Sequence, residues 1–178
     1  IQTRAYLQEL SKKEFLALIV NNRGNKHREA GKYLEAIRDF SLAIAFYPKF
    51  VEAYYSRGIT YADIGRYDDA IKECNAALAL DSQCPYAYAN RGVAYSGKGD
   101  TENALKDYNK ALAFDPKMAG VYSNRGILYS DKGDMQKAVD DYNNAIALDS
   151  TLAAAYFNRA NLLRDIGELT LAIEDYRA

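Results

Sequence analysis

Carboxamide side chains recur along this chain at intervals of 34 residues. The column they form, meaning a set of residues 34 positions apart, holds four asparagines and one serine: Asn22, Ser56, Asn90, Asn124 and Asn158. A carboxamide offers both a hydrogen-bond donor and an acceptor, so a row of them can hold the backbone of an extended peptide without reading its side chains. The alternative is that these side chains are solvated or form hydrogen bonds within a hairpin. A solvated face more often carries Lys and Glu, which favours peptide binding.

A column of arginines follows the carboxamide column directly, and an acidic residue stands sixteen positions after each arginine. The pairs are Arg23 with Asp39, Arg57 with Glu73, Arg91 with Asp107, Arg125 with Asp141 and Arg159 with Asp175. A partly buried guanidinium grips a carboxylate through two hydrogen bonds, and loss of one partner leaves a costly unpaired charge. We therefore predict structural ion pairs that fix the register of neighbouring helices. An anion-binding site is the alternative.

Residues that commonly carry catalysis or bind metals are sparse. The chain has a single histidine, His27, and two cysteines, Cys74 and Cys84. His27 takes a core position that other copies of the repeat fill with tyrosine, and the chain has neither metal-ligand spacing nor a phosphate-binding glycine loop. These observations predict a non-catalytic protein without metal or cofactor. Cys74 shares a column with Phe40 and Tyr108, so we interpret it as a core residue and favour a reducing, cytoplasmic compartment.

Composition narrows the class of partner. Among 178 residues, 23 Lys and Arg nearly balance 24 Asp and Glu, which leaves no overall positive field for nucleic acid. The longest apolar run, residues 15–20, is far shorter than the roughly 18 residues that a membrane span needs. We therefore expect a protein or peptide partner, no nucleic acid and no membrane span. The chain begins at Ile1 without an initiator Met, so the question of an upstream signal stays open.

The repeated residues must be positioned by helices. Apolar and small residues recur at steps of three and four from Tyr54 to Ile64, and a second such stripe runs from Tyr67 to Leu78. Gly65, between them, can adopt the left-handed conformation that ends a helix. Each unit is thus predicted to be an antiparallel helical hairpin that buries its apolar face on its neighbours, which makes the fold an all-α solenoid. The predicted units of this single solenoid domain are 17–50, 51–84, 85–118, 119–152 and a truncated 153–178.

Small residues and turn residues complete the predicted hairpin. Gly58 and Gly126 on first helices are expected to let the second helix approach where Ala70 and Ala138 face them, because bulk there would overpack the pair. The unit junctions, such as Asp81-Ser82, carry residues suited to turns or to N-caps of the next helix. Ser11 and Glu14 form a capping box, which predicts a helix from Lys12 to about residue 30. Residues 1–16 are interpreted as a helical cap or a degenerate repeat.

These residues resemble the tetratricopeptide repeat (TPR) family. The signature positions of that 34-residue motif are matched by Tyr54, Gly58, Tyr61, Ala70 and Ala77. The chain departs from the signature in two places: the leading Trp is replaced by Val or Tyr, and the usual Leu before Gly is replaced by the arginine column. The resemblance implies a right-handed superhelix of hairpins, with first helices lining a concave groove.

The resemblance also implies which residues line that groove. The carboxamide column is similar to the asparagine ladder of some TPR superhelices, and the residues expected beside it are Tyr55, Ile59, Tyr86, Val93, Ile127, Phe157 and Asn161. The carboxylate clamp with which some family members bind acidic chaperone tails is not expected. Where its basic residues should stand, the chain has Asn21, Tyr86 and Asn90.

Three functions fit this reading. The first is a non-catalytic scaffold that binds an extended segment of a partner protein in the groove. The second is a substrate-recruiting or regulatory region of a larger enzyme or signalling protein, and the third is a secretion or assembly chaperone. Because the sequence stops at Ala178, inside the predicted second helix of its last unit, we also expect either further repeats or self-association through that end.

Overall fold

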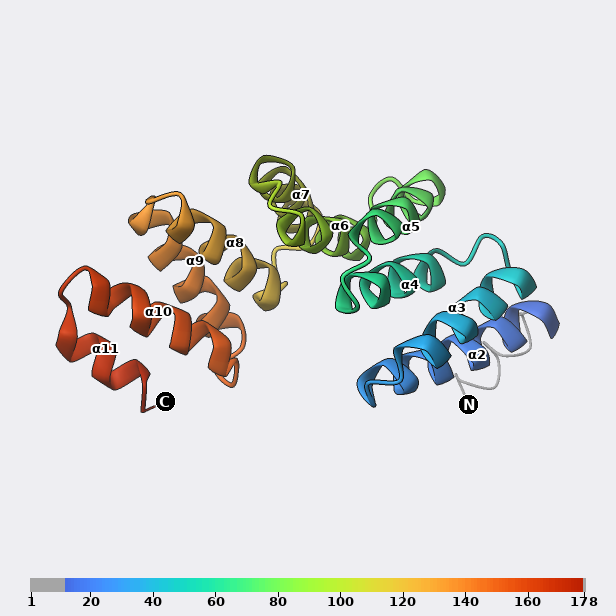
Figure 1. Cartoon of the computed structure of the whole chain (residues 1–178), viewed down its shortest axis with the longest axis horizontal. Helices are drawn as coiled ribbons and strands as arrows, with labels where there is room; N and C mark the ends of the chain where they lie inside the picture. The colour runs from blue at the N-terminus through green and yellow to red at the C-terminus, as the bar shows by residue number, and fades with distance from the viewer. Residues whose placement is uncertain (1–11, 178) are drawn as a thin grey trace. The chain divides into compact units, whose positions relative to one another are not determined.

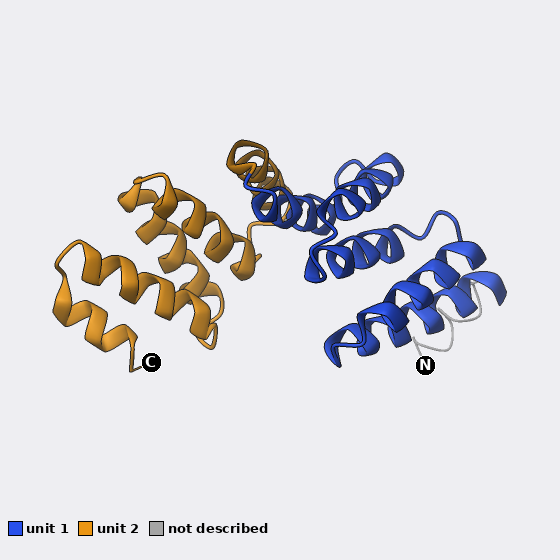
Figure 2. Ribbon diagram, in the orientation of Figure 1, with its two compact units in different colours: residues 1–99 blue, residues 100–178 orange. Residues whose placement is uncertain are grey.

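The protein is helical throughout the part that its computed structural model describes, residues 12–177. This part contains ten α-helices and no strand. The chain divides into two compact units, residues 1–99 and 100–178 (Figure 2), and each is described by itself. Of the predicted cap at 1–16, residues 1–11 lie outside the described residues, as does Ser11 of the predicted capping box, and residues 12–16 belong to the first described helix.

Unit 1 consists of two hairpins and one further helix (Figure 1). Its helices are α2 (Lys12–Glu29), α3 (Tyr33–Phe46), α4 (Val51–Asp63), α5 (Tyr67–Leu80) and α6 (Pro85–Gly97). Helix α2 packs on α3 and α4 packs on α5, as the hairpin prediction requires. Helix α4 also contacts both α2 and α6, so the first helices of successive repeats are direct neighbours.

Unit 2 repeats this arrangement with one leading helix and two hairpins. Its helices are α7 (Thr101–Phe114), α8 (Ala119–Asp131), α9 (Met135–Leu148), α10 (Ala153–Asp165) and α11 (Leu169–Asp175). The hairpins are α8 with α9 and α10 with α11, and α10 also contacts α8 and α9. Both units thus stack helical hairpins of one design.

Glycines in the left-handed conformation end the first helices. Gly31, Gly65, Gly99, Gly133 and Gly167 have φ angles between 71° and 91°. At Gly65 the backbone closes with a hydrogen bond of 2.9 Å from Arg66 N–H to the Tyr61 carbonyl, which is the bond that satisfies the end of a helix. The predicted role of this glycine column is confirmed.

The junctions between repeats use aspartate in turns and not as helix caps. Asp81, Asp115 and Asp149 each accept a hydrogen bond of 2.9–3.0 Å from the backbone N–H two residues later. The residues at the caps of the following first helices are apolar and form no side-chain cap: Cys84, Met118 and Leu152. Aspartate therefore shapes the turn, and the cap residue Cys84 packs with Ala77 and Ala87 of the two repeats that meet there.

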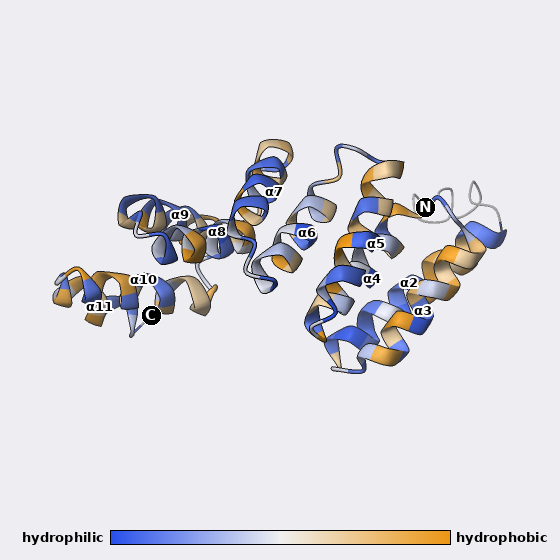
Figure 3. Cartoon of the chain, turned by 45° about the horizontal axis from the view of Figure 1, so that its top comes forward, coloured by the Kyte–Doolittle hydropathy of each residue, from blue (hydrophilic) through white to orange (hydrophobic). Residues whose placement is uncertain are grey.

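The hairpin cores combine many alanines with larger side chains, among them the column of Phe40, Cys74, Tyr108 and Tyr142. Ala36, Ala70 and Ala138 are fully buried. A Cβ placed on Gly126 would lie 2.7 Å from Tyr142 Cε1, and one on Gly58 would lie 2.9 Å from Cys74 Sγ. The first-helix glycine therefore makes room chiefly for this larger side chain, whereas the sequence predicts the facing alanine. Figure 3 shows hydrophobic (orange) and hydrophilic (blue) residues interspersed along individual helices.

Candidate functional site

The arginine column contacts the acid column at close range. In Arg125, Nε lies 2.8 Å from Asp141 Oδ2 and Nη2 lies 2.7 Å from Oδ1. The same two-bond geometry joins Arg159 to Asp175 at 2.7 and 2.6 Å. Arg57 instead reaches Glu73 through a single nitrogen, at 2.6 Å. Arg91 and Asp107 belong to different units, and their pairing stays a prediction.

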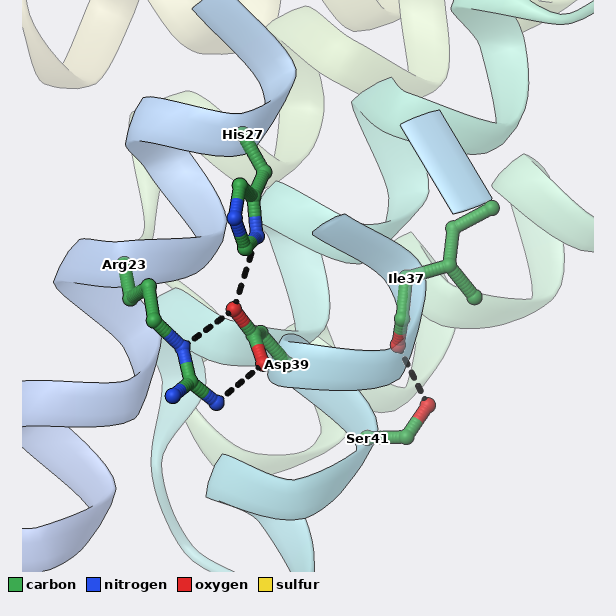
Figure 4. Close-up of polar contacts among 5 residues, drawn as sticks. All are labelled: Arg23, His27, Ile37, Asp39 and Ser41. Atoms are coloured by element: carbon green, nitrogen blue, oxygen red, sulfur yellow. Dashed lines mark hydrogen bonds and ion pairs between the residues drawn. The ribbon is translucent and has the colours of Figure 1, made fainter. Parts of the chain in front are cut away.

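Asp39 contacts two basic side chains, Arg23 and His27 (Figure 4). Its carboxylate accepts bonds of 2.8 and 2.6 Å from Arg23 and lies 3.0 Å from Nδ1 of His27. The hydrogen bond from Arg23 holds the pKa of Asp39 below its usual range, in opposition to the effect of burial. His27 is thus a half-buried partner of an ion pair, and this contact explains a polar side chain at a position that tyrosine fills elsewhere.

Sequence reasoning missed a further column that the arginines also contact. Each of four arginines donates from Nη1 to a side-chain oxygen sixteen residues earlier, on the preceding hairpin's second helix. The distances are 2.8 Å for Arg57 to Ser41, 2.5 Å for Arg91 to Asn75, 2.6 Å for Arg125 to Asn109 and 2.5 Å for Arg159 to Asn143. The signal was present in the sequence, because these acceptors stand two residues after each acid.

The carboxamide column is not uniform. Asn90 donates from Nδ2 to the Tyr55 carbonyl at 3.0 Å and so ties α6 to α4. Ser56 is only 6% exposed. Among residues 12–177, no hydrogen bond joins the side chain of Asn22, Asn124 or Asn158 to another residue, and none of these three is fully buried.

Two predicted groove residues of unit 1 come together as a stacked aromatic pair. The rings of Tyr55 on α4 and Tyr86 on α6 have centroids 5.5 Å apart and planes inclined by 23°. Tyr55 is half-buried, and burial raises the pKa of its hydroxyl. Tyr86 is 51% exposed. Ile59 of α4 and Val93 of α6 are partly buried and pack against one core cluster.

In unit 2 the predicted groove residues are more exposed. Phe157 is 58% exposed, and its ring meets that of Tyr176 edge-on at 6.1 Å. The hydroxyl of Tyr176 donates to Asn161 Oδ1 at 2.6 Å, so that carboxamide oxygen is engaged within the hairpin. Ile127 is exposed on α8. The described residues contain no cluster of three His, Cys, Asp or Glu side chains suited to a metal ion, and none of the helices described is both long and apolar enough to cross a membrane.

Stacked hairpins with a 34-residue period define a helical repeat protein. Models of the tetratricopeptide repeat match residues 21–85, 85–118, 119–152 and 153–178. The chain therefore belongs to the tetratricopeptide repeat family. A comparison with curated protein sequences gave no match.

Solved structures of the same fold cover most of the chain. A crystal structure of MamA is 27% identical over 86% of this chain and 90% of its own, with a TM-score of 0.70. The thermophilic TPR protein TTC0263 of Thermus thermophilus is 24% identical over 90% of this chain and 88% of its own, with a TM-score of 0.79. The first TPR domain of Spaghetti (RPAP3), bound to the HSP90 peptide SRMEEVD, is 27% identical over 67% of this chain and 95% of its own, with a TM-score of 0.63.

Proposed function

We propose that this chain is a non-catalytic protein-interaction scaffold whose first-helix faces hold an extended segment of a partner protein. The observation that carries the proposal is the set of carboxamides at Asn22, Asn124 and Asn158, which share one column and have no partner among the described residues. A partly exposed carboxamide that is not used by the fold can donate to and accept from a peptide backbone. Asn90 keeps its Oδ1 for this purpose, since only its Nδ2 is bonded to Tyr55.

The RPAP3 domain, which is bound to a peptide, supports peptide binding by a chain of the same family. Its peptide, SRMEEVD, is acidic. In the present chain Asn21 is fully buried and donates to Glu52 at 2.8 Å, so this part of unit 1 presents a carboxylate and not a cation. A like-charged tail would be repelled there. We therefore propose a partner segment other than an acidic tail.

The test is selection of short random peptides, displayed on phage, against the purified chain. We expect wild type to enrich a set of peptides, and Asn124→Ala/Asn158→Ala to bind that set more weakly by about tenfold or more, because two bidentate backbone contacts are lost. The matched control is Asn144→Ala, an exposed carboxamide on α9 outside the column. Circular dichroism checks that each variant is folded.

Two results would contradict the proposal. Equal binding by wild type and the double variant would remove the carboxamide column from the binding surface. Failure of wild type to enrich any peptide would remove peptide binding altogether. Self-association through α11, where Leu169, Leu171 and Ile173 are exposed, stays a prediction that sedimentation velocity tests.

A further inference from the structure

We propose that Tyr55, Tyr86 and Glu52 form a recognition site on unit 1 for a positively charged side chain, arginine or lysine, of the bound segment. This inference rests on the proposed function and adds to it the chemistry of the partner. It combines two observations: a pair of stacked rings in which Tyr86 is exposed, and a carboxylate three residues from Tyr55 on the same helix.

Successive first helices contact each other through residues that are 31 positions apart, and the stacked rings are one such contact. Tyr55 and Tyr86 are 31 residues apart on α4 and α6. One repeat earlier the same step joins Asn21 of α2 to Glu52 of α4, through the bond of 2.8 Å from Asn21 Nδ2 to Glu52 Oε1. Both contacts lie where successive first helices meet. The contact that holds the carboxylate and the contact between the two rings are therefore at equivalent positions in adjacent repeats.

Glu52 and Tyr55 share one face of α4. They are three residues apart, which makes them neighbours on a helix surface. Burial raises the pKa of the Tyr55 hydroxyl, and the nearby negative charge of Glu52 raises it further. The buried Asn21 amide donates to one carboxylate oxygen of Glu52 and so fixes the orientation of that side chain.

No cation of the described chain neutralises Glu52. The basic side chain that reaches α4 from α2 is Arg28, and its Nε is paired with Asp63 Oδ2 at 2.7 Å. Arg57, on α4 itself, is directed to Glu73 and Ser41 on second helices. Among residues 12–177, no Lys, Arg or His forms an ion pair with Glu52. Its carboxylate therefore keeps the capacity to pair with a cation from outside.

Half of the Tyr86 surface is exposed, although one side of its ring stacks on Tyr55. The face of a tyrosine ring carries negative potential, so a guanidinium or ammonium group placed over it is attracted. A nearby carboxylate strengthens the preference for a cation.

The experiment uses the peptides selected on wild type as probes. We expect Arg or Lys to be enriched over the input library at one position of those peptides. In the best binder, replacement of that arginine by its neutral isostere citrulline, or of that lysine by Gln, should weaken binding to wild type by about tenfold. The same replacement should change binding to Glu52→Gln and Tyr86→Leu by no more than about twofold.

Two controls separate the site from general effects. Tyr86→Phe keeps the ring and should retain the preference for a cation. Glu35→Gln removes an exposed acid from α3 of the same unit and should leave the preference unchanged, which excludes an effect of net charge. Thermal melts of Tyr86→Leu and Glu52→Gln check that both variants remain folded.

The outcomes distinguish this inference from the proposed function. Enriched peptides without Arg or Lys, or with a cation whose removal has the same effect on wild type and Glu52→Gln, would overturn the cation site and leave peptide binding standing. A wild type that selects no peptide would overturn both.

Discussion

The arginine that precedes each first-helix glycine contacts two hairpins at once. Arg125 grips Asp141 of its own hairpin through Nε and Nη2, and it donates from Nη1 to Asn109 on the preceding second helix. Its guanidinium also lies 5.4 Å from the ring centroid of Tyr122, three residues earlier. A planar guanidinium has several fixed donors and a flat face, so it can contact the carboxylate, the carboxamide and the ring at once, whereas Lys or Leu cannot. This accounts for the departure from the leucine of the family signature.

The energetic weight of this contact can be measured at Arg125 and Asp141. Asp141 is 3% exposed, so Arg125→Leu leaves a buried carboxylate without its cation, and we expect a loss of about 3 kcal/mol in the free energy of unfolding. Arg125→Leu/Asp141→Leu should lose less, because no charge remains buried. Urea denaturation of wild type, both single variants and the double variant measures the coupling. Simple additivity would contradict the pairing.

The exposed pair of Arg164 and Asp165 provides the matched control in the same unit. Its guanidinium and carboxylate lie 2.8 Å apart, yet more than half of each side chain is exposed. Solvent screens such pairs, and they contribute little to stability. Arg164→Leu should therefore leave the denaturation midpoint almost unchanged. A large shift there would mean that arginine removal destabilises the protein for reasons other than burial of an acid.

The lowered pKa of Asp39 predicts how the free energy of unfolding changes with pH in acid. The folded-state pKa of this residue is depressed, mainly by the hydrogen bond from Arg23, so its contribution is present above the unfolded value of about 3.9 and is lost as pH falls through the folded pKa. Wild type should lose stability steadily below about pH 4. Asp39→Asn should be less stable at pH 7 and show a flatter slope in acid. Equal acid slopes for the two proteins, measured by urea denaturation at several pH values, would count against this assignment.

At the scale of helices, the close approach of the two members of a hairpin depends on the first-helix glycine. A methyl group on Gly126 would stand 2.7 Å from Cε1 of the buried Tyr142, so Gly126→Ala should cost about 1–3 kcal/mol through overpacking. Gly120 lies in the same helix with nothing within 4 Å, and Gly120→Ala should stabilise by up to about 1 kcal/mol through helix propensity. Thermal melts of both variants should thus move in opposite directions. A shift of the same sign would refute the packing role.

The helices and their ends were predictable from sequence, whereas several side-chain contacts between them were not. The three-and-four spacing and the glycine of each unit fix where a helix lies and where it ends, as Gly65 shows with its φ of 75°. Helical period alone does not fix how neighbouring hairpins are rotated against each other. Ser56 is buried and Asn158 is partly exposed, although both stand in one column. Asn75 also contacts Arg91 across a repeat boundary.

At the scale of the whole molecule, most interactions link residues that are close in sequence. The arginine bonds span 16 residues in either direction, and the first-helix contacts at Asn21 and Tyr55 span 31. A repeat protein of this kind has a stability that approximates the sum of hairpin and nearest-neighbour terms. Helices with neighbours on two sides should therefore be more stable than helices with a neighbour on one side.

Within unit 2 this argument ranks α9 above α11. Helix α9 contacts α8 and α10 and buries four of its side chains, namely Ala138, Asp141, Tyr142 and Ala145. Helix α11 contacts α10 and buries only Ala172 and Asp175, while Leu169 and Ile173 remain at least half exposed. Few buried contacts give low local stability, so amides of α11 should exchange with solvent at least about tenfold faster than those of α9.

Hydrogen exchange, followed by mass spectrometry at two protein concentrations, tests this ranking of α9 and α11. A monomer should show fast exchange in α11 at both concentrations, because local opening does not depend on other copies. Protection of α11 that rises with concentration would instead mean that a second copy covers the exposed Leu169 and Ile173, which is the predicted self-association. Equal protection of α9 and α11 at both concentrations would contradict the nearest-neighbour account, since the apolar contacts that distinguish the two helices would then not determine their stability.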